Sequence, residues 1–208
     1  MKLYYSKGAC SLVVRILIHE MQLPCEYEAV NLGTKITVNG TDFLTINPKG
    51  AVPVLITDDN SVLTENAVIQ QYLADTYQAH QLLPPLGDFQ RYRVLEWVNF
   101  ITTEIHKSFS PIFNANIPDA FKEGVITPIL QTKFAIVNQA LEKNQYLMGK
   151  QFTLPDAYLF VMLLWAASKK IDLKKYPNLI RFFSELKQRK AIIEALAEED
   201  INAEKAVL

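Results

Sequence analysis

The chain has 208 residues, of which 50% are hydrophobic and 21% are charged, and its formal net charge is -1 at pH 7. This length allows one large domain or two small ones with a packed core, and the near-neutral charge gives no indication of nucleic-acid binding. No apolar run approaches the length of a membrane span.

The cysteine content and the N-terminus together predict a reducing compartment. Cys10 and Cys25 do not form a disulfide framework. The chain passes from Met1-Lys2 directly into a strand-like segment, so we expect no secretory signal peptide. We therefore expect a cytoplasmic protein.

The first eighty residues alternate between strand and helix patterns. Strand patterns occupy residues 2–5, 27–32, 52–57 and 61–64, and helix patterns occupy 11–22 and 65–77. Asp58-Asp59-Asn60 joins the last two strands as a hairpin turn. The order β-α-β followed by β-β-α predicts a small mixed sheet covered by helices.

The remainder of the chain is helical in pattern. A Pro- and Gly-containing stretch, residues 82–88, interrupts the alternation and indicates a linker, which we set at 81–90. Helix patterns follow at 91–109, 121–143, 156–170 and 177–196. The sequence therefore predicts an α/β domain at 1–80 and an all-α domain at 91–208.

Cys10 lies where the first strand has ended and the first helix begins. The free N–H groups and the positive dipole end of a helix N-terminus favour a thiolate, and Lys7 is close in sequence. Val13 occupies the position of a second cysteine, which excludes a thioredoxin-like dithiol. A reactive single thiol and a small buried side chain remain equal alternatives from position alone.

Two further segments suit a ligand site. If the Val52–Pro53 bond is cis, the backbone of Val52 offers its N–H and C=O to a ligand. Most X–Pro bonds are trans, however. The alternative is that Pro53 only marks the start of a strand. Glu65 and Asn66 open the second helix, where backbone donors bind carboxylates and Glu65 can accept an ammonium. The alternative for these two residues is helix capping.

The predicted helix at 91–109 has two faces. Its apolar stripe, which repeats at steps of three and four residues, comprises Val94, Trp97, Val98, Ile101 and Ile105. A separate polar face carries Asn99, Thr103 and His106, with Lys107 next in sequence. These polar groups suit a small polar ligand, and His106 can help to hold a thiolate, whereas the alternative is a solvated helix face.

Other motifs have structural or negative meaning. Thr153 and Asp156 precede an apolar helix and predict a capping box. No zinc, P-loop or dinucleotide pattern is present, and His19, His80 and His106 are not spaced as metal ligands. We therefore predict no metal site.

Taken together in order, these segments resemble the bacterial beta-class glutathione transferases. The resemblance is carried by residues 2–5, 8–12, 47–50, 52–53, 64–65, 71–75, 91–92, 96–97, 103–107 and 152–160. Each segment is a weak signal by itself, but their collinear combination is highly specific. It spans the chain from the first residues to the last helices.

This resemblance implies a thioredoxin-like glutathione-binding domain at 1–80, a linker at 81–90 and an all-helical domain at 91–208. It implies a cytoplasmic homodimer that conjugates the glutathione thiolate to small hydrophobic electrophiles in detoxification. Glutathione would be a co-substrate, with no cofactor, nucleic-acid or membrane partner. The helical domain would hold the electrophile pocket, around Ile112, Phe113 and Trp165.

The resemblance also assigns residues to a glutathione site between the domains. Cys10 and His106 would be catalytic, beside the glutathione sulfur. Across a cis bond to Pro53, Val52 would bind the cysteinyl backbone. The remaining contacts would come from Lys35 at the glycyl carboxylate, from Glu65 and Asn66 at the γ-glutamyl end, and from Asn99, Thr103, Glu104 and Ile105 on the helical wall.

Two residues depart from the family pattern, and two rival functions remain. Asn66 stands where Ser or Gly is frequent, and its amide can still donate to a carboxylate. Arg15 stands where His is frequent, and either adds positive potential or is solvated. The rivals are glutathione-dependent thiol transfer or peroxide reduction through a Cys10 mixed disulfide, and a non-catalytic binding protein.

Overall fold

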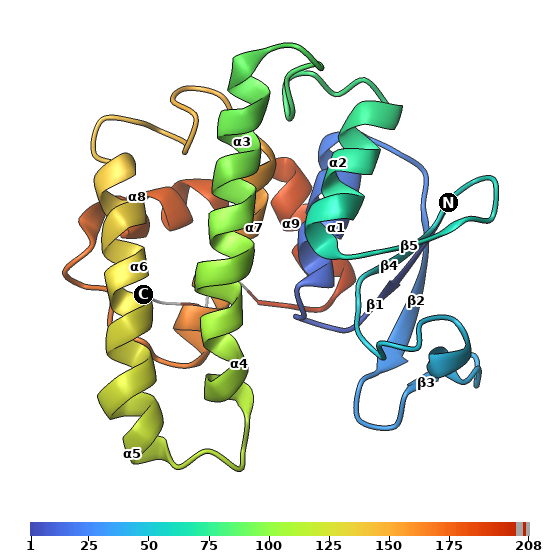
Figure 1. Ribbon diagram of the computed structural model, residues 1–208, viewed down its shortest axis with the longest axis horizontal. Coiled ribbons are helices and arrows are strands. Elements are labelled where there is room, and N and C mark those ends of the chain that lie inside the picture. Colours follow the sequence, from blue (N-terminus) through green and yellow to red (C-terminus); the bar gives the residue numbers. More distant parts are fainter. Residues whose placement is uncertain (203–205, 207–208) are drawn as a thin grey trace. The chain divides into compact units, whose positions relative to one another are not determined.

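A computed structural model describes residues 1–202 and 206 (Figure 1). The chain forms two compact units. The first contains Met1–His80 together with Arg189–Asn202, and the second contains Gln81–Gln188. The predicted division near residue 80 therefore corresponds to a change of unit. Residues 189–202, which we assigned to the all-helical domain, belong to the first unit instead.

The first unit is built on a five-stranded sheet in the order β3-β2-β1-β4-β5. Its strands are β1 (Lys2–Tyr5), β2 (Glu26–Asn31), β3 (Ile36–Thr37), β4 (Val54–Ile56) and β5 (Val62–Thr64). Strands β1 and β2 are parallel and the other pairs are antiparallel. A parallel pair needs a crossover, which α1 (Ser11–Glu20) supplies. The predicted mixed sheet is confirmed. Strand β3 was not predicted, because two residues are too few to show a strand pattern.

Alternation along β1 gives the sheet two apolar faces. Leu3 points to the face that α1 and α2 (Asn66–Thr76) cover, and Tyr4 points to the face that the 3-10 turn η1 (Phe43–Thr45) covers. The first core comprises Leu3, Val14, Ile18, Leu55, Ile69 and Leu73. The second comprises Tyr4, Val30, Phe43, Val52 and Val54. Val52 is thus fixed by packing before any ligand is considered.

The last helix differs from our prediction. The pattern at 177–196 indicated one helix, but the chain forms α8 (Pro177–Leu186) and α9 (Lys190–Glu198), separated by residues 187–189. Helix α9 packs beside α1 in the first unit, as the red and blue ribbons of Figure 1 show. Arg189 binds the Glu20 carboxylate through Nε at 2.8 Å and through Nη2 at 2.5 Å, which holds the start of α9 to the end of α1.

The described part of the second unit is helical, as predicted. Its helices and π-helical segments are α3 (Phe89–Phe100), η2 (Ile101–His106), α4 (Lys107–Phe113), α5 (Asp119–Phe121), η3 (Lys122–Ile126), α6 (Thr127–Ala140), α7 (Leu154–Ser168) and α8. Helix α7 is buried on nearly all sides, which explains its continuous apolar sequence. Helices α3, α6 and α8 and the segment η2 pack against one another or against α7.

The predicted capping box at the start of α7 is confirmed. The Asp156 carboxylate accepts the Thr153 N–H and hydroxyl, both at 2.8 Å, and the Leu147 N–H at 2.9 Å. All of these groups are buried. These donors are buried away from water, so leaving them without the Asp156 acceptor would be costly.

We predict that Asp156→Ala destabilises the protein by about 3 kcal/mol, because three buried donors lose their acceptor. Asp88 is the matched control, since its carboxylate caps α3 at Gln90 N–H (2.8 Å) on the surface. Asp88→Ala should cost only about 1 kcal/mol. Urea unfolding measures both values. An Asp156→Ala variant that kept its stability and lost activity would contradict the structural role.

Candidate functional site

The loop from Tyr5 to Cys10 joins β1 to α1 and is held at both ends. The Ser11 hydroxyl oxygen accepts the Ser6 N–H at 3.2 Å, which closes the loop onto the first turn of the helix. Gly8 has φ +69°, a backbone conformation that favours glycine, and its N–H donates to Glu199 of the first unit at 2.7 Å. These two hydrogen bonds, from loop N–H groups to side chains, therefore help to fix the position of Cys10.

Cys10 immediately precedes α1, as predicted, and is half-buried. Its thiol donates to the Val52 carbonyl at 3.4 Å. Its own carbonyl accepts the Asn66 side-chain amide at 2.6 Å. The Val52–Pro53 bond is cis, so that prediction is confirmed. Two of the predicted residues, Val52 and Asn66, are thus hydrogen-bonded to Cys10.

Asn66 connects the start of α2 with the start of α1. One hydrogen of its side-chain amide is donated to the Cys10 carbonyl, and its oxygen accepts the Gln70 side-chain amide at 2.7 Å, so the second amide hydrogen is left for the predicted bond to a ligand carboxylate. The residue is 7% exposed. An Asn has a longer reach than the Ser or Gly expected there, so it spans from α2 to the start of α1. Its backbone N–H still lies in the first turn of α2.

Glu65 has an unusual backbone for a residue with a side chain. Its φ of 69° and ψ of 114° lie in a sparsely populated region, just before the first residue of α2. Its exposed carboxylate pairs with Lys49 at 2.6 Å, and Lys49 also donates to the Thr64 hydroxyl at 3.0 Å. The conformation directs the Glu65 carboxylate away from the core and into solvent.

Lys35 also has positive φ, 62°, and its ammonium donates to the Gly50 carbonyl at 2.7 Å. The segment from Lys49 to Val52 therefore touches three predicted site residues: Glu65 through Lys49, Lys35 through Gly50, and Cys10 through Val52. Such a convergence on one loop is what a ligand-binding loop on a rigid sheet requires.

Arg15 is buried, so the prediction that it is solvated is wrong. It is 2% exposed and its guanidinium lies between the rings of Tyr5 and Tyr27, at 4.2 and 3.8 Å from their centroids. It binds Glu199 at 3.1 Å and Glu198 at 2.6 Å. Burial raises the pKa of the Glu199 carboxyl, although the hydrogen bond from the Gly8 N–H and the charge of Arg15 each lower it.

The second unit places its predicted residues on a distorted helix. We predicted one regular helix at 91–109, but residues 101–106 form the π-helical segment η2. The Thr103 hydroxyl donates to the Asn99 carbonyl at 3.0 Å, and the Thr102 hydroxyl donates to Val98 at 2.7 Å. Such bonds to the preceding turn accompany helix distortion. π-Helical turns are frequent at functional sites, and apolar periodicity does not reveal them.

His106 ends η2 and is half-buried. Its Nδ1 lies 2.7 Å from the Tyr158 hydroxyl, and its ring contacts Trp165 edge-on at 5.0 Å. Burial, reinforced by the positive charge of Lys107, lowers the pKa of His106 from 6.5 to about 4. At neutral pH this imidazole is therefore uncharged and acts through hydrogen bonds.

The other residues predicted on this wall differ in exposure. Asn99 and Thr103 are exposed. Glu104 pairs with Lys133 of α6. Ile105 is fully buried in the core, so our assignment of Ile105 as a ligand contact is wrong for its side chain. It belongs to the apolar stripe that the same helix pattern had already indicated.

The residues suggested for an electrophile pocket form an aromatic cluster. Trp165 contacts Phe113 at 4.9 Å and Phe109 at 5.5 Å, both edge-on. The Lys169 ammonium lies 4.7 Å from the Phe113 ring centroid. Phe113 is exposed and Ile112 is buried, so Phe113 and Trp165 are better placed than Ile112 to contact an electrophile.

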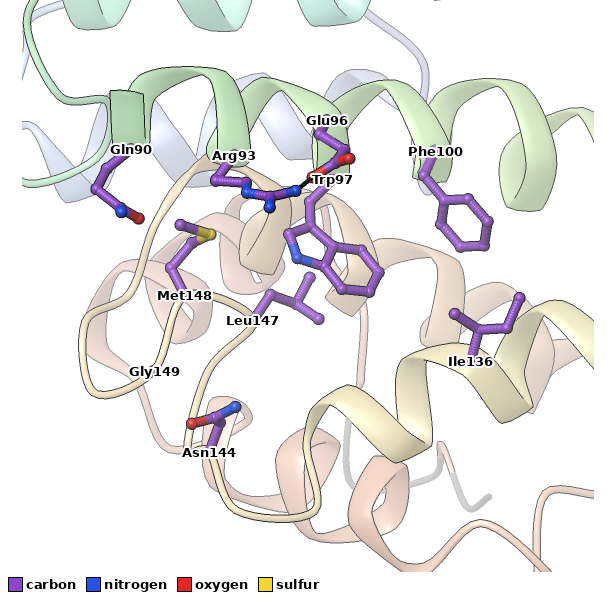
Figure 2. Close-up of a pocket in the computed structure, with 10 residues that line it drawn as sticks. All are labelled: Gln90, Arg93, Glu96, Trp97, Phe100, Ile136, Asn144, Leu147, Met148 and Gly149. Atoms are coloured by element: carbon purple, nitrogen blue, oxygen red, sulfur yellow. Dashed lines mark hydrogen bonds and ion pairs between the residues drawn. The ribbon is translucent and has the colours of Figure 1, made fainter. Parts of the chain in front are cut away.

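A cavity of about 650 Å³ lies elsewhere in the second unit (Figure 2). Figure 2 shows side chains of α3 on one side and of α6 and the loop at 144–149 on the other. The lining comprises Gln90, Arg93, Glu96, Trp97, Phe100, Ile136, Asn144, Leu147, Met148 and Gly149. None of the predicted site residues is among them, so this cavity is not the predicted electrophile pocket.

Within residues 1–202 and 206, no group of three or more His, Cys, Asp or Glu side chains is arranged to hold a metal ion. None of the helices described is both long and apolar enough to cross a bilayer.

Two family models match this chain. Residues 8–76 match the family model for the glutathione S-transferase N-terminal domain, and residues 126–190 match that for the C-terminal domain. The Escherichia coli O157:H7 glutathione S-transferase GstA is 39% identical over 97% of this chain and 100% of its own length.

Solved structures of glutathione S-transferases are also similar to this chain. A bacterial beta-class glutathione S-transferase of Sphingomonas chungbukensis is 36% identical, with a TM-score of 0.92 over 97% of this chain and 100% of that one. A sphingomonad glutathione S-transferase complexed with glutathione is 37% identical, with a TM-score of 0.92 and the same coverage.

We predict that His106 makes the protein less stable as the pH falls from 6.5 to about 4. In this window the imidazole of the unfolded chain takes up a proton and the buried imidazole does not, so the free energy of unfolding falls by up to about 3 kcal/mol. Urea unfolding of the native chain and of His106→Gln across this window measures the effect. A difference between the two that does not vary with pH would contradict the prediction.

Proposed function

The chain belongs to the glutathione S-transferase family, and we propose that it conjugates the glutathione thiolate to small hydrophobic electrophiles. The resemblance to the bacterial beta class and the predicted fold are both confirmed by the matches. Which residues bind glutathione, and how, is our proposal. The observation that carries it is the convergence of Cys10, Lys35 and Glu65 on the segment Lys49–Val52.

In this proposal the cysteinyl part of glutathione pairs with the backbone of Val52. Val52 is packed in the second core of the sheet, so its backbone is a rigid docking edge. The Cys10 thiol already uses the Val52 carbonyl, which indicates how close the glutathione sulfur would come to Cys10. Cys10 then meets that sulfur rather than attacking the electrophile itself.

The two ends of the tripeptide have separate partners. The glutathione ammonium takes the place of the Lys49 ammonium at Glu65, and the adjacent carboxylate accepts N–H groups at the start of α2. Lys35 exchanges the Gly50 carbonyl for the glycyl carboxylate. The first exchange replaces one ion pair of Glu65 with another, and the second replaces a neutral carbonyl acceptor of Lys35 with a charged carboxylate.

Ionisation of the glutathione thiol is the chemical requirement, because the thiolate is the nucleophile. The N-terminus of α1 supplies a positive dipole end beside Cys10. Since burial keeps His106 neutral at pH 7, we propose that His106 contributes an N–H hydrogen bond to the thiolate and not a positive charge. Phe113 and Trp165 offer aromatic surface for an apolar electrophile.

Thiol transfer is the second candidate, favoured by the half-buried Cys10 at a helix N-terminus. Its thiolate attacks a mixed glutathione disulfide, releasing the other thiol, and a second glutathione then displaces Cys10 to give glutathione disulfide. Conjugation does not require this sulfur, so the two reactions separate by mutation. A binding protein without turnover is the third candidate.

The remaining partner assignments are also proposals. We propose a homodimer, in which the exposed aromatic side chains of Phe89 and Tyr92 on α3, 65% and 57% exposed, are covered by a second copy. Glutathione is a co-substrate in this proposal, and the proposed cytoplasmic location is supported by the cysteine content.

We predict that Cys10→Ala abolishes glutathione-dependent thiol transfer while keeping at least about a tenth of the conjugation of an aromatic halide, since that nucleophile belongs to glutathione. Cys25→Ala is the matched control. Burial raises the pKa of that half-buried thiol from 9.0 to about 11, and the thiol donates to the Glu26 carbonyl, so the variant should leave both reactions unchanged.

Assays of both reactions, after retention on immobilised glutathione, decide among the three candidates. If Cys10→Ala affects neither reaction, Cys10 has no catalytic role. If the native chain binds glutathione but turns over no electrophile or disulfide, it is a binding protein.

We predict that Glu65→Gln raises the KM for glutathione about tenfold with a smaller effect on kcat, because a charge-assisted bond to the ammonium is lost in both ground and transition states. Glu26→Gln, at an exposed glutamate of β2, is the control and should change neither constant. An unchanged KM in the Glu65 variant would remove Glu65 from the binding site.

A further inference from the structure

Tyr158 is a buried phenol that the proposed mechanism has not yet used. It lies in the first turns of α7, two residues after the Asp156 cap, and is fully buried. Its hydroxyl is 2.7 Å from Nδ1 of His106. A buried tyrosine hydroxyl needs a hydrogen-bond partner, and here its partner is the one imidazole of the proposed site.

The His106 ring has one proton to place. A neutral imidazole carries a hydrogen on one nitrogen and a lone pair on the other, so the partner of Nδ1 decides what Nε2 presents. Within residues 1–202 and 206, no group is hydrogen-bonded to Nε2 of His106. Nε2 is therefore the nitrogen that remains for a ligand.

We propose that Tyr158 is a positioning residue that donates its hydroxyl proton to Nδ1 of His106 and thereby holds the tautomer that carries the hydrogen on Nε2. The Nε2–H group is then a donor for the glutathione sulfur. This inference rests on the proposed function of His106. With the opposite tautomer, Nε2 would present a lone pair to a thiolate, and two electron-rich atoms would repel.

The surroundings of the ring support this role. The Trp165 ring contacts His106 edge-on at 5.0 Å and 81°, and the Tyr158 ring does so at 5.8 Å and 69°. Two aromatic contacts and one hydrogen bond restrain rotation of the imidazole about its side-chain bonds. Burial also keeps the ring neutral, so at working pH it carries one N–H proton, whose position the Tyr158 contact can set.

The first test uses the native protein. In ¹⁵N–¹H spectra of the histidine-labelled chain, the proposal expects His106 Nε2 to resonate as a protonated nitrogen and Nδ1 as an unprotonated, hydrogen-bonded one. The assignment follows from the signal that disappears in His106→Gln. A protonated Nδ1, donating to the Tyr158 oxygen, would overturn the proposal without any activity measurement.

The second test uses Tyr158→Phe, with Tyr176→Phe as the matched control. The Tyr176 hydroxyl donates to the Gln131 carbonyl at 2.7 Å in the same unit, so its loss removes a comparable hydrogen bond away from His106. In Tyr158→Phe, the Nδ1 signal should move toward that of a nitrogen without a hydrogen bond. The conjugation kcat should fall about tenfold at little-changed glutathione KM. An unchanged Nδ1 signal would overturn the proposal.

A double variant separates this proposal from the proposed function. Gln at position 106 places an amide N–H near the former Nε2 and has no tautomer to set. If Tyr158 acts through the imidazole, adding Tyr158→Phe to His106→Gln should cost less than about twofold in kcat. A tenfold further loss would mean that Tyr158 acts by packing and would overturn the inference.

If His106→Gln and His106→Ala both leave conjugation unchanged while the native tautomer is as expected, the role of His106 fails and the tautomer assignment stands.

Discussion

The Glu199 carboxylate joins the buried Arg15 guanidinium to the N–H of Gly8, and the geometry of the Cys10 loop depends on it. A guanidinium that is 2% exposed must be neutralised, and the sheet and its two covering helices offer no carboxylate to it. The carboxylates come from the end of α9, which explains why a segment so late in the chain belongs to the first unit. The same carboxylate then fixes Gly8, two residues before the thiol.

The proposed site works by oriented dipoles more than by fixed charge. Cys10 lies at a helix N-terminus, Val52 offers backbone groups, and His106 is neutral because burial lowers its pKa to about 4. A neutral donor stabilises a thiolate without holding it in so tight an ion pair that its nucleophilicity falls. The charged residues, Lys35 and Glu65, lie toward the ends of the proposed tripeptide and serve binding.

Asn66 and Gln70 illustrate how one departure from a family pattern changes a local network. In this chain the Asn66 amide reaches the Cys10 carbonyl, and Gln70 one turn later holds the Asn66 oxygen. The two amides thereby connect the start of α2 with the start of α1. A residue that we predicted as a ligand contact is thus also a structural link, and its second amide hydrogen and its backbone N–H remain for a carboxylate.

The sequence by itself determined the local structure: the hairpin at 52–64, the helix after Cys10, the Asp156 cap and the apolar stripe that includes Ile105. These follow from periodicity, turn residues and capping, which act over a few neighbouring positions. The motifs in order also determined the family. Tertiary structure alone decided the contacts among residues distant in sequence: α9 on α1, Asn66 on Cys10, and Tyr158 on His106. Such contacts depend on burial, which makes an unpaired charge or donor costly wherever in the chain its partner lies.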